Sequence, residues 1–191
     1  MAPRSGQKEE GRKRILAAAE RGFRRHGYGG LGIDGLAREA GVTSGAFYAH
    51  FASKAAAFRE AVRTGIDQYR QGIEQMQATE GRGWLRYLID FYMSERRTCD
   101  LGEACALQSL AGDVARAGDD AKEVFEEELE GLIASAAAGV QADSERGRRA
   151  QATALLALLA GGVSMARAVK DPALSEEIAE AVRQAAMRLV G

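Results

Sequence analysis

Residues 41–51 read GVTSGAFYAHF, which is the pattern of a tight turn followed by a short helix. Gly41 can take a positive φ because it has no Cβ, and Thr43 is a good N-cap for a helix that begins at the next residue. Phe47 and Phe51 lie four residues apart, so they share the buried face of that helix. The opposite face keeps small residues, hydroxyls and the ring of Tyr48, which can approach base edges in a major groove. The stretch therefore predicts the turn and recognition helix of a helix-turn-helix.

Two further helices are expected before this stretch. The first covers about residues 9–26 and stops at Gly27, and the second covers about residues 33–40. With the recognition helix they form a three-helix DNA-binding head, which we assign to residues 9–54. Residues 1–8 precede the head and have the composition of a flexible basic tail.

Apolar residues recur at helical spacing through the rest of the chain. The only prolines are Pro3 and Pro172, and Ala, Leu, Glu and Arg are frequent, so we expect an all-α fold of about nine helices. We assign residues 55–191 to a larger helical domain for ligand binding and dimerisation. Its helices are expected at about residues 54–79, 84–96, 101–117, 119–140, 144–168 and 175–190.

The net charge of −1 hides an asymmetry between the two parts of the chain. Residues 1–54 hold ten Lys and Arg against five Asp and Glu, whereas residues 55–191 hold sixteen against twenty-two. A basic N-terminal part joined to an acidic remainder favours an anionic partner for the N-terminal part, and nucleic acid is the usual one. A solvated charged surface is the alternative that charge alone leaves open.

Other function classes find little support in the sequence. The two histidines, His26 and His50, stand in no metal-ligand spacing, and no glycine-rich phosphate loop follows a strand. We therefore expect no catalytic residues, no metal and no cofactor, and we do not expect an enzyme. The two cysteines make no disulfide framework, no long apolar segment is free of charge, and no signal peptide opens the chain. These features lead us to expect a cytoplasmic protein without a membrane span.

A longer ordered pattern surrounds the helix-turn-helix, made up of residues 15–19, 23, 27–28, 33–37, 40–43, 45–51 and 53–54. In this pattern, over about residues 9–66, the chain resembles the TetR family of bacterial transcriptional regulators. The resemblance implies a homodimeric all-α repressor that binds DNA through its first three helices and a small molecule in its larger domain. It also implies phosphate contacts by Thr43, Tyr48, His50 and Lys54, and positions near base edges for Gly45, Ala46 and Ala49.

The chain departs from the TetR pattern at two positions that bear on DNA binding. The family often has Lys where this chain has Ser44, and Ser or Thr where it has Gly32, so the second helix has a weaker cap. Few side chains on the exposed face can hydrogen-bond. Specificity is therefore expected to lean on methyl groups, the Tyr48 ring, Ser44 and DNA shape. Arg38 and the basic tail are candidates for additional contacts.

The larger domain holds apolar, sulfur-containing and polar residues at helical spacing that suit a small apolar or amphipathic ligand. The candidates are Tyr69, Met76, Trp84, Tyr87, Leu88, Phe91, Tyr92, Cys105, Gln108, Phe125 and Leu129. An ordinary core is the alternative for each of them, because Met and aromatic side chains usually fill space. Residues 105–116 also look like a segment of one branch of TetR-like regulators. Cys105 has a further interpretation as a reactive thiol that senses an electrophile or oxidant.

Residues 150–168 are apolar on nearly all sides, so the helix that they form must be covered on several sides. Together with the last helix they predict a two-fold four-helix interface of a homodimer, over about residues 144–190. Burial of the same helix within one chain is the alternative.

Taken together, these patterns predict a DNA-binding transcriptional regulator, namely a repressor that a ligand releases from a palindromic double-stranded DNA operator. Ligand binding would shift the population toward a head separation that no longer fits two major-groove half-sites. Two alternatives stay open. One is a helical ligand-binding or protein-interaction module without DNA binding, and the other is a thiol-based sensor that acts through Cys105.

Overall fold

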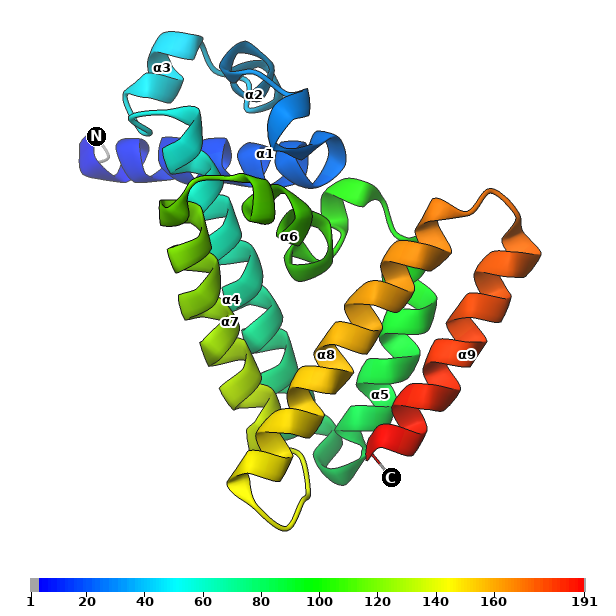
Figure 1. Ribbon diagram of the computed structural model, residues 1–191. Coiled ribbons are helices and arrows are strands. Elements are labelled where there is room, and N and C mark those ends of the chain that lie inside the picture. The colour runs from blue at the N-terminus through cyan, green and yellow to red at the C-terminus, as the bar shows by residue number, and fades with distance from the viewer. Residues whose placement is uncertain (1–3, 191) are drawn as a thin grey trace. The chain divides into compact units, whose positions relative to one another are not determined.

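The computed structural model describes the backbone of residues 4–190 and the side chains of residues 8–190, and its regular elements are all helical (Figure 1). The predicted all-α fold class is therefore confirmed. In chain order the α-helices are α1 (Arg4–Gly30), α2 (Ile33–Glu39), α3 (Ser44–Tyr48), α4 (Lys54–Glu80), α5 (Trp84–Phe91), α6 (Ala106–Arg116), α7 (Asp119–Ala138), α8 (Glu145–Ala168) and α9 (Pro172–Val190). Short helical turns lie between some of them: η1 (Gly81–Gly83) and η3 (Leu101–Glu103) are 3-10 turns, and η2 (Tyr92–Arg96) is a π-helical turn.

Helix α1 begins at Arg4 rather than at about residue 9, so residues 4–8 of the predicted tail are helical. The rest of that tail, residues 1–3, lies outside the described residues, and its flexibility stays a prediction. The expected stop at Gly27 is a break within α1, where φ is 72° and the helix resumes for a short stretch to Gly30. Glycine adopts this left-handed backbone without a Cβ clash, which explains why the break falls there.

Several helices begin at side-chain caps, of which Thr43 is the one predicted above. Thr43, Ser53 and Ser144 each accept a hydrogen bond from the backbone N–H three residues on, at 3.1, 3.0 and 3.0 Å. Helix α9 begins at Pro172 rather than at about residue 175. Asp171 accepts a 2.9 Å bond from the N–H of Ala173, and proline suits the first turn of a helix, so the earlier start has a local cause.

The turn η2 interrupts a segment that the apolar pattern predicts as one continuous helix. A π turn holds more residues than an α turn, so it redirects the side chains that follow it. Arg97, directly after η2, donates hydrogen bonds to Ser175 Oγ at 2.9 Å and to Glu176 Oε2 at 2.5 Å. Arg97 thus contacts α9 directly after the π turn. A local apolar pattern cannot predict such contacts, because they join residues far apart in the chain.

Packing divides the chain into two compact units, each of which is described by itself. Unit 1 combines the N-terminal residues through Gly65 with Leu101–Glu126. Within it α1 packs against α2, α6 and η3, and α2 packs against α3 (Figure 1). Its fully buried side chains include Ile15, Phe23, Leu36, Phe47 and Phe58. Unit 1 thus holds the predicted three-helix head together with α6, while the functional boundary expected between residues 54 and 55 stays a prediction.

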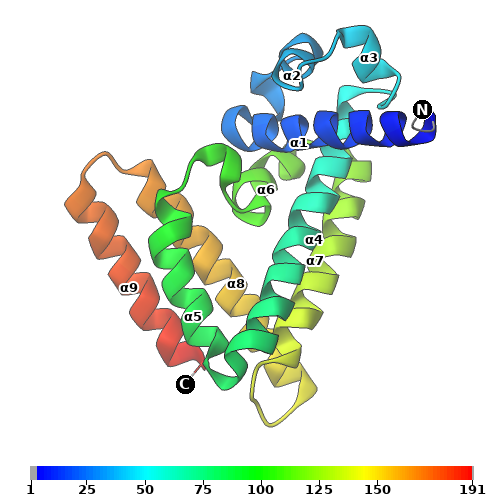
Figure 2. The same cartoon turned by 180° about the vertical axis from the view of Figure 1, so that it is seen from behind.

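Unit 2 combines Ile66–Asp100 with the residues from Glu127 onward. Helices α8 and α9 lie side by side in it, and α9 also packs against α5 and η2 (Figure 2). Leu155, Leu159 and Val163 of α8 are buried. By length and composition alone α8 could cross a membrane, but a packed core helix has the same composition, so this property is weak evidence for a span.

Candidate functional site

The turn between α2 and α3 is closed by backbone hydrogen bonds at a left-handed glycine. Gly41 has a φ of 67°. Its N–H donates to the carbonyl of Arg38 at 3.1 Å, and the N–H of Val42 donates to the carbonyl of Ala37 at 2.9 Å. These two bonds form a Schellman motif, which ends a helix sharply and satisfies its last carbonyls. The motif fixes the direction in which the chain leaves α2 and enters α3.

Helix α3 buries one face and exposes the other. Phe47 and Phe51 are 0% and 4% exposed, whereas Tyr48 is 54% exposed. Gly45 and Ala49 are exposed as well, and a Cβ built on Gly45 would meet nothing closer than 3.8 Å. The outward face is therefore composed of small groups and one amphipathic ring, which permits close approach to a DNA groove.

Arg38, Thr43 and Ala46 are three further residues at this turn that are predicted to contact DNA, and they differ in exposure and hydrogen bonding. Arg38 is exposed on α2 and, across the described residues, has neither a hydrogen-bond partner nor an ion-pair partner for its guanidinium. Thr43 is exposed, but its hydroxyl oxygen accepts the N–H of Ala46, which is itself half-buried. Arg38 is thus the cation of this group that is available to an anionic partner.

Ser44 is held by a residue that the sequence analysis did not single out. Its hydroxyl donates to a carboxylate oxygen of Asp34 at 2.5 Å. Asp34 is exposed in the first turn of α2, so the bond ties the start of α2 to the start of α3. An Asp ten positions from a Ser carries no periodic signal, which is why the pair could not be found before the turn geometry was known.

Lys54, at the first position of α4, lies over the ring of Tyr28. Its Nζ stands 4.5 Å from the ring centroid, which is a cation–π geometry. The same ring packs on Phe58 at 4.8 Å and on Phe23 at 6.0 Å between centroids. The aromatic group therefore holds the ammonium close to the N-terminus of α4, where helix N–H groups also attract phosphate.

His50 is half-buried against α1. A Cβ built on Gly11 would stand 3.1 Å from His50 Nε2, so the imidazole packs closely against this glycine. Close by in unit 1, Arg12 lies over the Phe51 ring at 5.1 Å and forms a 3.1 Å ion pair with Glu60. His50, Arg12 and Glu60 share the lining of a hollow of about 380 Å³. Residues of α1, the segment between α3 and α4, α4 and α7 line this hollow, and its Arg12 is already paired with an acid.

The predicted ligand-binding residues are distributed over both units. Unit 1 holds Cys105, Gln108 and Phe125, which are half-buried, and Cys105 is the N-terminal boundary residue of α6. Unit 2 holds the others, which are Tyr69, Met76, Trp84, Tyr87, Leu88, Phe91, Tyr92 and Leu129. A single pocket lined by residues of both groups stays a prediction.

Within unit 2 the aromatic members of this set form ring contacts. Tyr69 packs on Tyr92 at 5.3 Å, and Tyr87 stacks nearly parallel on Phe91 at 6.3 Å between centroids. The guanidinium of Arg96, which the sequence analysis missed, lies 5.1 Å from the centroid of Phe91. Tyr87 is 47% exposed, so this stack reaches the surface of the unit.

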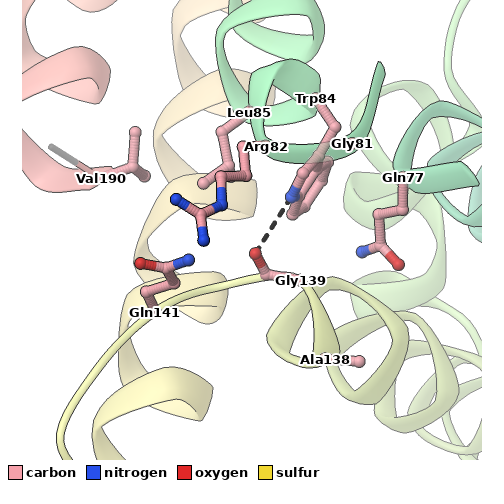
Figure 3. Close-up of a pocket in the computed structure, with 9 residues that line it drawn as sticks. All are labelled: Gln77, Gly81, Arg82, Trp84, Leu85, Ala138, Gly139, Gln141 and Val190. Carbon is pink, nitrogen blue, oxygen red and sulfur yellow. Dashed lines mark hydrogen bonds between the residues drawn. The ribbon is translucent and has the colours of Figure 1, made fainter. Parts of the chain in front are cut away.

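A cavity of about 420 Å³ opens in unit 2 beside Trp84 (Figure 3). Trp84 is the predicted ligand-binding residue that lines it, and the sequence analysis missed Gln77, Arg82 and Gln141, which line it too. The indole Nε1 donates to the carbonyl of Gly139 at 3.0 Å. The lining residues come from segments far apart in the chain, so no local sequence motif could predict that they share a cavity.

Two pKa shifts arise on the surface of unit 2, away from the helix-turn-helix. The side-chain hydrogen bond and the charge of Asp67 raise the pKa of Arg70. Hydrogen bonds from Gln184 and Arg183 lower the pKa of Glu180. Among the residues with described side chains, no group of three or more His, Cys, Asp or Glu could hold a metal ion.

Comparison with known proteins points to one family. The family model described as bacterial regulatory proteins, tetR family, matches residues 15–61, which contain the α2–α3 turn and the start of α4. The HTH-type transcriptional repressor NemR of Escherichia coli K12 is 27% identical over 126 residues, 64% of this chain and 63% of NemR. The matched part therefore spans less than two thirds of that relative.

Solved structures match over nearly the whole chain. The reduced form of Escherichia coli NemR gives a TM-score of 0.80 at 20% identity, covering 95% of this chain and 97% of NemR. A TetR-family regulator from Agrobacterium tumefaciens gives a TM-score of 0.78 at 18% identity, covering 96% of this chain and all of the other. At these identities the structural likeness establishes the fold.

Proposed function

Because the N-terminal helices of this chain belong to the TetR family of bacterial regulatory proteins, we propose that it is a DNA-binding transcriptional regulator. The observation that carries the proposal is the division of α3 into a buried face at Phe47 and an outward face at Tyr48. In this role α3 enters the major groove, and the small side chains at Gly45 and Ala49 let its backbone approach the bases.

The charged and polar residues around α3 suit contacts with the DNA backbone. Lys54 is braced on the Tyr28 ring at the N-terminus of α4, and Arg38 has no partner of its own across the described residues. Tyr48 and His50 can each donate to a phosphate oxygen, and such contacts position a protein on DNA without reading its sequence. Specificity then rests on methyl contacts, the Tyr48 ring and DNA shape.

The test is a binding series with duplexes that tile the DNA upstream of the gene for this chain. We expect one duplex to bind tightly, with an affinity that falls steeply as salt rises from roughly 50 to 200 mM, because phosphate contacts release counterions. The double variant Tyr48→Ala, Lys54→Ala should lose at least about tenfold in affinity for it, equal to about 1.4 kcal/mol.

The matched control is Lys122→Ala, which removes an exposed lysine of α7 and should leave DNA affinity unchanged. Equal binding by the double variant and the control would reject this docking. Absence of salt-dependent binding to every duplex would instead favour a helical ligand-binding or protein-interaction module.

The same proposal includes a homodimer formed through residues 144–190. Met165 on α8 and Leu174 on α9 are large apolar residues exposed by 61% and 42%, which supports an intermolecular face there. A two-fold dimer would present two copies of α3 to the half-sites of a palindromic operator. Sedimentation velocity should report a dimer that Met165→Glu dissociates and Leu101→Glu, an exposed site in unit 1, does not.

Repression released by a small apolar or amphipathic ligand completes the proposed mechanism. A ligand that binds one dimer conformation better shifts the population toward it, and the effect on DNA is limited by that difference in affinity. In this proposal the protein acts in the bacterial cytoplasm, where its operator lies, and it acts by binding.

Thiol sensing through Cys105 is a second candidate. Cys105 is a free, half-buried thiol at the N-terminal boundary of α6. One of the solved structures that this chain resembles is described as the reduced form of Escherichia coli NemR, which makes oxidation state worth testing here. An electrophile such as N-ethylmaleimide should release DNA from the wild type and from Cys99→Ser but not from Cys105→Ser. Release that is unchanged in Cys105→Ser would remove this candidate.

A further inference from the structure

The cavity beside Trp84 lies wholly within unit 2 and is assembled from three segments (Figure 3). The end of α4 and the start of α5 supply Gln77, Arg82 and Trp84. The loop directly after α7 supplies Gly139 and Gln141. The end of α9 supplies Val190. A volume of about 420 Å³ falls in the range of small-molecule sites.

The wall of this cavity is fixed by long-range hydrogen bonds. Trp84 Nε1 donates to the carbonyl of Gly139 at 3.0 Å, and Gln77 Nε2 donates to the carbonyl of Ser135 at 2.9 Å. A Cβ on Gly139 would stand 2.7 Å from both donor nitrogens, so this close approach requires glycine. Bonds between α7 and the segment at the end of α4 therefore hold the indole in place without a ligand.

The polar groups of the cavity are cationic or neutral. None of the residues that line it is acidic, and Arg82 contributes the charge. Arg82 and Gln141 have no hydrogen-bond or ion-pair partner anywhere in the described chain. Figure 3 shows the guanidinium and the Gln141 amide turned toward one another, with the Trp84 indole on the same cavity. Two exposed side chains with unpaired donors thus line the cavity together with the buried Trp84.

We propose that this cavity binds a small monocarboxylate that carries a flat apolar group. The carboxylate pairs with the Arg82 guanidinium, whose planar fork matches it, and accepts a second donor from the Gln141 amide. The apolar group packs against Trp84, Leu85 and Val190. The site rests on the proposed binding of a small ligand and names its chemical class, and binding to it can be measured on the full chain without an operator.

Trp84 supplies the measurement, since it is the single tryptophan of the chain. Phenylacetate is the probe, and phenylacetamide is its neutral counterpart with the same ring. Addition of phenylacetate to the full-length protein should change Trp84 emission saturably. Phenylacetamide should bind about fivefold more weakly, a modest ratio because Arg82 is exposed and water screens the ion pair.

The decisive variant is Arg82→Gln, with Arg86→Gln as its matched control on the same segment. Arg86 is exposed, pairs with Asp90 and does not line the cavity. Arg82→Gln should lose about fivefold in phenylacetate affinity, Arg82→Lys should fall between it and the wild type, and Arg86→Gln should match the wild type. Far-ultraviolet circular dichroism of each variant confirms that the fold is retained.

Three results would overturn the site. They are the lack of any saturable emission change with phenylacetate, equal affinity for the carboxylate and the amide, and equal loss of affinity in Arg82→Gln and Arg86→Gln. Each of these leaves the DNA-binding proposal standing, because its own test uses the α3 variants and duplex DNA. Conversely, if the protein binds phenylacetate through Arg82 but binds none of the DNA duplexes, the proposed ligand site stands and the proposed DNA-binding function is rejected.

Discussion

The backbone N–H of Tyr28 donates a 2.8 Å hydrogen bond to a carboxylate oxygen of Asp113, which joins the end of α1 to α6 within unit 1. The bond exists because the break at Gly27 frees this N–H from the helical ladder. The ring of the same tyrosine lies under Lys54. Tyr28 therefore carries both an anchor to α6 through its backbone and a support for a predicted phosphate contact through its side chain.

Removal of the Asp113 carboxylate should loosen unit 1. Asp113→Ala leaves the N–H of Tyr28 without its acceptor, and loss of a hydrogen bond to a charged group costs about 1.5–3 kcal/mol. Urea unfolding should show a lower midpoint with an unchanged slope. Asp113→Asn keeps an acceptor oxygen at this position and should lose less than half as much. Equal stability of the alanine variant and the wild type would show that the bond contributes nothing.

A side chain at Gly27 should be costly for two separate reasons. The residue has a φ of 72°, and a Cβ would stand 3.1 Å from Asp113 Oδ2. Gly27→Ala is therefore expected to destabilise the protein by about 1–3 kcal/mol, because with a ψ of 169° this backbone lies in a region that is essentially confined to glycine. The double variant Gly27→Ala, Asp113→Ala should cost less than the sum of the two single changes, because the close approach is absent in it. Strict additivity in urea unfolding would contradict the contact.

The Tyr28 ring should matter to DNA binding through Lys54. Tyr28→Leu removes the cation–π contact, worth about 0.5–1 kcal/mol at an exposed site, and should weaken binding to the upstream duplex by roughly two- to fivefold. Tyr28→Phe keeps a ring face and should bind like the wild type. Fluorescence anisotropy at several salt concentrations measures both. If the leucine and phenylalanine variants bind equally well, the ring does not position Lys54.

The packing of α8 on α9 should be sensitive to one glycine. A Cβ on Gly162 would stand 2.7 Å from Val182 Cγ1, so Gly162→Ala forces the two helices apart at an expected cost of about 1–3 kcal/mol. The control is Gly72→Ala in α4, where a Cβ would meet nothing within 4 Å and better helix propensity should stabilise by about 0.5–1 kcal/mol. Thermal unfolding should move in opposite directions for the two variants. A stabilised Gly162→Ala would show that the helices are not in close contact there.

Features set by neighbouring residues could be predicted from the sequence. The cap at Thr43 and the left-handed Gly41 depend on bonds that span a few residues, and the structure has both as expected. The two faces of α3 follow from helical spacing in the same way. These features were enough to define the helix-turn-helix and the all-α class.

Features set by distant residues could not be predicted. The bond from Tyr28 to Asp113 spans 85 positions, and the Trp84 indole finds its acceptor 55 positions away. No spacing pattern in the sequence links Arg82 to the other residues of the cavity, so it could not be distinguished from an ordinary charged surface residue. Helical periodicity identifies which side of a helix is buried, but it does not say which other helix covers that side.

The π-helical turn at Tyr92–Arg96 has a consequence for changes in chain length. A π turn amounts to an α-helix with one added residue, and each residue advances the helix by about 100° of rotation. Because the wider turn takes up this added residue, deletion of one residue from it would restore regular local hydrogen bonding and leave Arg97 facing Ser175 and Glu176. We therefore expect that relatives can lack the added residue and still keep the arginine with its two acceptors, so that this segment tolerates a change in length of one residue without loss of the contact.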